Sequence, residues 1–125
     1  MTLRAVLDTS AIRLYAAQSL AVGELIRELS DEKVRFGLPA LCFVEAAQGA
    51  DKDAFSLLAV LGEHEFAEWL PLHGDQWREV ASAAHLLGTV ARACAALPVA
   101  HDEAVYVVTA HPDVYQDAGL EVISI

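Results

Sequence analysis

The run Leu3-Arg4-Ala5-Val6-Leu7-Asp8-Thr9-Ser10-Ala11 is mostly apolar until it stops at an acid and two hydroxyl residues. Residues 3–7 lack polar alternation, which predicts a buried strand of a parallel sheet with Asp8 at its carboxyl end. Ligands of open parallel sheets bind outside the carboxyl ends of the strands, so Asp8 is well placed for chemistry. Asp8 is also a preferred N-cap residue for a helix predicted over residues 11–17, and both roles stay open at this point.

Length and composition predict one domain, residues 1–125. The chain has 125 residues, 55% of them hydrophobic, but no apolar run approaches the roughly 20 residues that a membrane span needs. We recognise no secretory signal, because Asp8 interrupts the only apolar candidate near the N-terminus. Cys42 and Cys94 lie in apolar, helix-like segments, which favours a buried reduced thiol over a disulfide. We therefore expect a soluble cytoplasmic protein without a membrane partner.

The net charge is −10, from 18 acidic and 8 basic residues. Such a balance disfavours broad, non-specific attraction to nucleic acid. It does not disfavour a local site in which a hard divalent cation, such as Mg²⁺, neutralises a few carboxylates.

Predicted strands and helices alternate along the chain. Strand patterns cover residues 3–7, 34–38, 66–70, 105–109 and 121–125, and helix patterns cover 11–17, 23–29, 39–49, 54–61 and 76–87. A further helix starts after Thr89 and is predicted to end before Pro98, and Asp75 is predicted to cap the helix at 76–87. This alternation predicts a three-layer α/β/α sandwich with a central parallel sheet, and we expect Asp8 and Thr109 at the same edge of it.

Two further acids accompany these elements. Glu45 is the only acid of the apolar helix at 39–49, where it is either a site residue or an ordinary exposed glutamate. Asp113 follows the strand that ends at Thr109. His101 and Asp102 precede that strand, so we place them at the opposite end of the sheet, more than about 15 Å away.

Together, Asp8-Thr9-Ser10, the helix with Glu45, and the late strand ending in Thr109 with Asp113 resemble the PIN-domain fold. The resemblance is to the small ribonuclease toxins of toxin-antitoxin pairs. It implies that acids at the carboxyl end of the sheet hold one or two Mg²⁺ or Mn²⁺ ions, which activate a water to cut RNA. On this basis Asp8, Glu45 and Asp113 are assigned to catalysis and metal binding.

The same resemblance places Thr9, Ser10, Arg13 and Thr109 near the substrate, with Arg13 as a candidate phosphate contact. Arg92 has the same standing, and the alternative for both arginines is an ordinary surface position. The sequence departs from the family pattern at two places. Residues 88–92 contain no carboxylate where the third acid normally stands, and His111 stands where the fourth does. His111 is either an exposed turn residue or a ligand for an ion softer than Mg²⁺.

These observations predict a PIN-like, metal-dependent ribonuclease, the toxin of a toxin-antitoxin pair. The alternative is a catalytically inactive PIN-like protein that acts as a binding module. Candidate partners are an RNA substrate, an antitoxin protein and a second copy of the chain in a homodimer.

Overall fold

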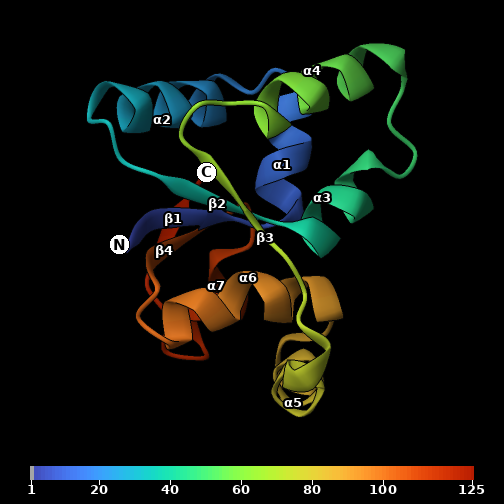
Figure 1. Ribbon diagram of the computed structural model, residues 1–125, viewed down its shortest axis with the longest axis vertical. Coiled ribbons are helices and arrows are strands. Elements are labelled where there is room, and N and C mark those ends of the chain that lie inside the picture. Colours follow the sequence, from blue (N-terminus) through green and yellow to red (C-terminus); the bar gives the residue numbers. More distant parts are fainter. Residues whose placement is uncertain (1) are drawn as a thin grey trace.

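The computed structural model describes residues 2–125 and contains one five-stranded parallel sheet (Figure 1). The strands are β1 (Leu3–Leu7), β2 (Phe36–Pro39), β3 (Ala67–Leu70), β4 (Ala104–Thr109) and β5 (Val122–Ser124). The α-helices are α1 (Thr9–Ala16), α2 (Leu20–Asp31), α3 (Ala40–Ala47), α4 (Lys52–Gly62), α5 (Trp77–Leu87), α6 (Val90–Ala100) and α7 (Pro112–Gln116), and a 3-10 helix, η1, covers Gly74–Gln76.

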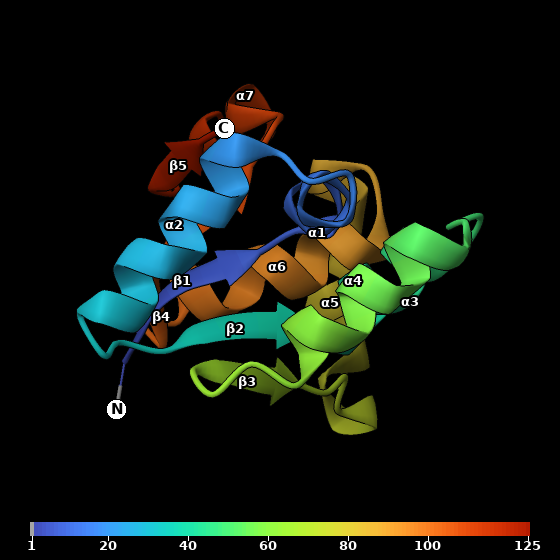
Figure 2. The same ribbon diagram turned by 90° about the horizontal axis from the view of Figure 1, so that it is seen from above.

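The strand order in the sheet is β3-β2-β1-β4-β5, and all neighbours are parallel. Figure 2 shows β3 and β5 at opposite edges of the sheet. Parallel connections are right-handed, so the chain must cover one face while it moves from β1 to β3 and the other face while it moves from β4 to β5. Figure 1 shows α1, α2 and α4 on one side and α5, α6 and α7 on the other. The predicted three-layer α/β/α sandwich is therefore confirmed.

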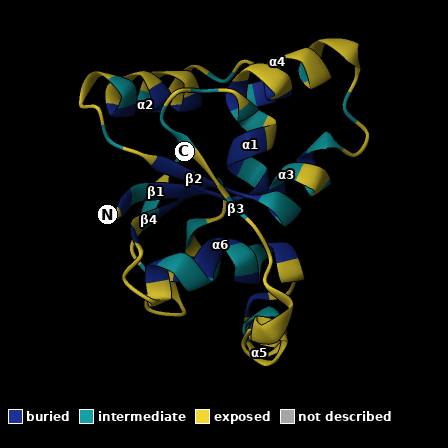
Figure 3. Cartoon of the chain, viewed as in Figure 1, coloured by how far each residue is buried: buried dark blue, intermediate teal, exposed yellow. Residues whose placement is uncertain are grey.

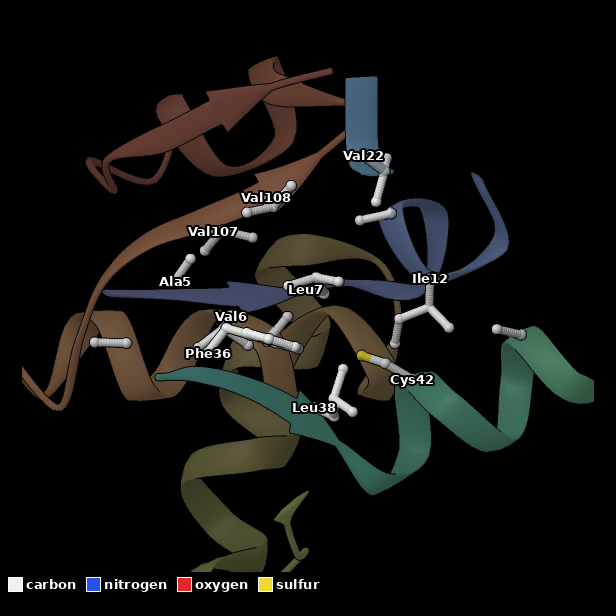
Figure 4. Close-up of a cluster of buried hydrophobic side chains, with 14 of the residues drawn as sticks. Ala5, Val6, Leu7, Ile12, Val22, Phe36, Leu38, Cys42, Val107 and Val108 are labelled. Carbon is white, nitrogen blue, oxygen red and sulfur yellow. The ribbon is translucent and has the colours of Figure 1, made fainter. Parts of the chain in front are cut away.

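The hydrophobic core surrounds β1, because this strand is central and covered on both faces. Ala5, Val6 and Leu7 are completely buried, as the dark central strands in Figure 3 illustrate. Side chains from the surrounding helices join this cluster, among them Ile12 of α1 and Cys42 of α3, which Figure 4 shows to the right of Leu7. A strand buried on both faces explains why residues 3–7 read as a continuous apolar run.

The predicted strands are all present, with small differences in their ends. The pattern at 34–38 becomes β2 at Phe36–Pro39, which carries Pro39 at its last position. The helix predicted at 11–17 begins at Thr9, because Asp8 caps it. The short helix α7 was not predicted. Asp75 does not cap α5, since it lies within η1 and the N-cap position belongs to Gln76.

The prediction that Pro98 ends its helix is wrong, because α6 continues to Ala100. Proline removes one helical hydrogen bond, to the carbonyl four residues earlier. Two carbonyls of the last turn nevertheless accept hydrogen bonds. Leu97 O accepts from His101 N at 2.9 Å, and Pro98 O accepts from Glu103 N at 2.8 Å. These bonds hold the last turn in place beyond the proline.

Both cysteines are free thiols, with Cys42 buried and Cys94 half-buried, as expected. Among residues 2–125 no single helix is long and apolar enough to cross a membrane. By length and composition alone, a pair bent by 108°, Gly74–Leu87 with Val90–Ala100, meets the requirement.

Candidate functional site

The carboxyl ends of β1 and β4 meet at the point where the strand order of the sheet reverses. Leu7 pairs with Val108, and the Asp8 amide donates to Val108 O at 3.2 Å. The chain leaves β1 toward β2 on one side, and β4 returns to its other side. In open parallel sheets, the crevice for a ligand lies at this reversal, outside the carboxyl ends of the strands. Asp8 is the first residue after β1 and lies at this position.

Asp8 is 3% exposed, and its carboxylate accepts three hydrogen bonds. Its Oδ1 accepts from Ala11 N at 3.0 Å and from Ser10 Oγ at 2.6 Å, and its Oδ2 accepts from Tyr115 OH at 2.9 Å. The bond from Ala11 confirms the capping role of Asp8 in α1. A carboxylate offers about four lone-pair positions. About one position, on Oδ2, therefore remains available to a further ligand.

Hydroxyl groups connect this acid to the end of β4. Ser10 Oγ accepts from Ala110 N at 2.9 Å and lies 3.4 Å from Thr109 Oγ1. Thr109 is completely buried, and its Oγ1 accepts from His111 N at 2.9 Å. The predicted placement of Asp8 and Thr109 at one edge is thereby confirmed, and Ser10 links them.

Tyr115 is the residue of this site that sequence reasoning missed. Its side chain is fully buried, and it comes from α7, which returns the chain from β4 to β5. Burial, and then the negative charge of Asp8, raise the pKa of the Tyr115 hydroxyl, so it remains a donor at neutral pH. The one available signal was Pro112, because proline is favoured at the first position of a helix.

Thr9 and Cys42 are buried residues close to Asp8. The Cys42 thiol donates to Ala91 O at 3.1 Å, and burial raises the pKa of this thiol to about 12. Thr9 Oγ1 is buried and has no hydrogen-bond partner within residues 2–125. Cys42 is therefore a packed, unreactive thiol at neutral pH rather than a nucleophile.

Glu45 and Arg13 lie together where α1 packs on α3. Arg13 is exposed, and its Nη2 donates to the backbone oxygen of Glu45 at 3.1 Å, so the Glu45 carboxylate is not its acceptor. Glu45 is half-buried. Its carboxylate is thus free of this arginine, and four of the five Arg13 donors remain for other partners.

Asp113 lies in the first turn of α7 and is exposed, as is His111, which precedes that helix. At the position of the missing third acid, Arg92 lies in the first turn of α6 and its Nη1 donates to Leu87 O at 3.1 Å. Within residues 2–125, no group of three or more His, Cys, Asp or Glu side chains is placed to hold one ion. The joint assignment of Asp8, Glu45 and Asp113 to one metal stays a prediction.

His101 and Asp102 lie at the opposite end of the sheet, as expected. They precede β4, and the neighbouring Glu103 O accepts from Leu3 N at 2.9 Å at the start of β1. These two residues therefore take no part in the site around Asp8.

No protein-family model matches the sequence, and no curated protein matches it. The resemblance to PIN domains thus rests on the residues and elements named above.

Proposed function

We propose that the chain is a PIN-like ribonuclease that depends on Mg²⁺ or Mn²⁺ and acts as the toxin of a toxin-antitoxin pair. The observation that carries the proposal is the buried Asp8 carboxylate at the reversal of the strand order, held by two side-chain hydroxyls and a backbone amide. This is the position at which parallel sheets bind ligands.

Helix capping alone does not explain this arrangement. Asp51 caps α4 with one bond, from Ala54 N at 2.8 Å, and its side chain is exposed. Asp8 makes the same cap while buried, and burial of a carboxylate is costly unless other donors compensate. The cap does not require the additional donors, Ser10 and Tyr115. They stabilise the charged Asp8 carboxylate in this crevice, which supports a role for Asp8 beyond the cap.

One ion fits the residues present better than two. Mg²⁺ binds through one or two carboxylates and keeps several waters, so the proposed ion would take the remaining position on Asp8 Oδ2, with Glu45 as its second carboxylate. Two ions need several shared carboxylates, and residues 88–92 contribute none. When bound, such an ion lowers the pKa of a water and stabilises charge on the phosphate.

The chain's own residues then orient the reacting groups. The Ser10 hydroxyl donates to Asp8 Oδ1 and accepts from Ala110 N, and so it connects Asp8 to the turn after β4. Arg13 is exposed beside Glu45, and its free donors suit a phosphate of single-stranded RNA. Because the net charge of −10 repels RNA, the local positive charge of Arg13 would set the place of binding.

The test is cleavage of a fluorescent single-stranded RNA in Mn²⁺, in Mg²⁺ and in chelator. We expect cleavage only with the metal, and its loss in Asp8→Asn. Asp51→Asn is the matched control, since it alters an equivalent helix cap without changing the Asp8 carboxylate or the groups that donate to it. If the wild type and Asp8→Asn cleave equally, the ribonuclease proposal is wrong.

A catalytically inactive binding module is the second candidate function. It is favoured by the 3% exposure of Asp8 and by the three protein donors that already use most of its capacity. A small antitoxin-like reading frame immediately upstream would favour the toxin. The binding module predicts instead that the chain binds its partner protein equally well as wild type and as Asp8→Asn. It also predicts no metal-dependent cleavage by either.

A further inference from the structure

We propose that Tyr115 is a positioning residue for the cation site: its hydroxyl fixes the plane of the Asp8 carboxylate and so the direction of the last free lone pair on Oδ2. The inference rests on the proposed function for the identity of the ligand. It adds to that function a residue from the C-terminal part of the chain, 107 positions away from Asp8.

The geometry of the carboxylate explains why a third donor is needed. Ala11 N and Ser10 Oγ both bond to Oδ1 and limit the torsion about the Cβ–Cγ bond to the range that these two bonds tolerate, and among the described residues only Tyr115 donates to Oδ2. This torsion has a broad, roughly two-fold preference in aspartate. A donor on the second oxygen removes the freedom, and Tyr115 OH supplies it at 2.9 Å.

Tyr115 is suited to this role because it cannot move easily. Tyr115 is fully buried, and its backbone carbonyl is held by two amides on its C-terminal side. Ala118 N and Leu120 N both donate to Tyr115 O, each at 3.1 Å. A rigid, buried donor of this kind bonds to the Asp8 carboxylate rather than to water, and so it orients the carboxylate.

The first measurement is a calorimetric titration of Mn²⁺ into the wild type, Tyr115→Phe and Tyr106→Phe. Phenylalanine keeps the ring and removes only the hydroxyl. Loss of such an orienting bond weakens metal binding by about 10-fold. Tyr106 is half-buried on β4, and Tyr106→Phe is the control variant. It should bind Mn²⁺ with the same affinity as the wild type.

The outcomes separate the two proposals. If the wild type binds Mn²⁺ and Tyr115→Phe binds it equally well or more tightly, the positioning role is wrong while the metal site stands. If the wild type binds no Mn²⁺, the metal-dependent function is wrong, and the positioning of a cation ligand with it.

A second measurement, in metal-free protein, checks the contact itself. We expect Tyr115→Phe to lower the melting temperature of the wild type, and to have no effect or the opposite effect in an Asp8→Ala background. In that background the hydroxyl has already lost its acceptor. Additive changes in the two backgrounds would mean that Tyr115 and Asp8 are not coupled, and would overturn the inference.

Discussion

The carboxylate of Asp8 caps α1 and also accepts from two side-chain hydroxyls, whereas the carboxylate of Asp51 only caps α4. A comparison of the two aspartates therefore distinguishes the stability that comes from the helix cap from the stability that comes from the additional hydrogen bonds. Because Asp8 is buried and Asp51 is exposed, the loss of their side chains should have different consequences.

Asp8→Ala should lower the free energy of unfolding by about 2–4 kcal/mol, the sum of a cap worth about 1 kcal/mol and a buried hydroxyl left without an acceptor. Asp51→Ala should lower it by about 1 kcal/mol, the cap alone. Urea denaturation of both variants measures the difference. Equal losses would show that the contacts of Asp8 to Ser10 and Tyr115 add no stability.

The two thiols should differ in reactivity. Burial raises the pKa of Cys42 to about 12, and burial also raises the pKa of the half-buried Cys94. Because only the thiolate reacts, and Cys42 is inaccessible as well, a disulfide reagent near pH 8 should modify Cys94 first and Cys42 only on unfolding. Cys94→Ala should abolish the fast phase of modification. A fast phase that survives in this variant would contradict the packing of Cys42.

An exposed ion pair connects α5 to the residue that follows α6: His101 Nε2 lies 2.6 Å from Glu79 Oε1. The hydrogen bond to Glu79, and then the charge of Glu79, raise the pKa of His101 above its ordinary value of 6.5. A raised pKa in the folded state gives stability that is fully present below 6.5 and is lost as pH rises through the folded-state pKa.

Glu79→Gln should therefore destabilise the protein near pH 6 and have almost no effect near pH 8.5. The difference should not exceed about 0.5 kcal/mol, since both side chains are exposed and solvent screens the pair. Denaturation curves at the two pH values, with Glu63→Gln as an exposed control, measure it. If Glu79→Gln destabilises the protein more near pH 8.5 than near pH 6, the pair with His101 is not the cause.

Across the whole molecule, a net charge of −10 on 125 residues makes the folded state repel itself. Salt screens this repulsion, so raising the NaCl concentration from about 0.05 M to about 0.5 M should raise the melting temperature at pH 7. The effect should disappear near pH 4.7, where the net charge is close to zero. Scanning calorimetry across salt at both pH values provides the check, and a salt effect of equal size at both would exclude self-repulsion as its cause.

Local patterns in the sequence were enough to predict the layered architecture and the placement of Asp8 and Thr109 at the same edge of the sheet. The apolar run at residues 3–7 predicted a buried strand of a parallel sheet, and Asp8 was a candidate for the helix cap and for the site. Periodicity, capping and right-handed crossover are properties of short segments, so they can be read without the tertiary structure. The position of Thr109 could also be predicted, because the carboxyl ends of parallel strands lie at one edge of the sheet.

Only the tertiary structure determined the partners of Asp8. Tyr115 reaches it from a five-residue helix, too short to show a periodic pattern, across 107 positions of the chain. Pro98 could not be placed from its own chemistry, because the bonds that continue α6 come from residues beyond it. In both cases the deciding free energy belongs to contacts between segments distant in sequence or outside the local pattern, and that free energy exists only once the chain has folded.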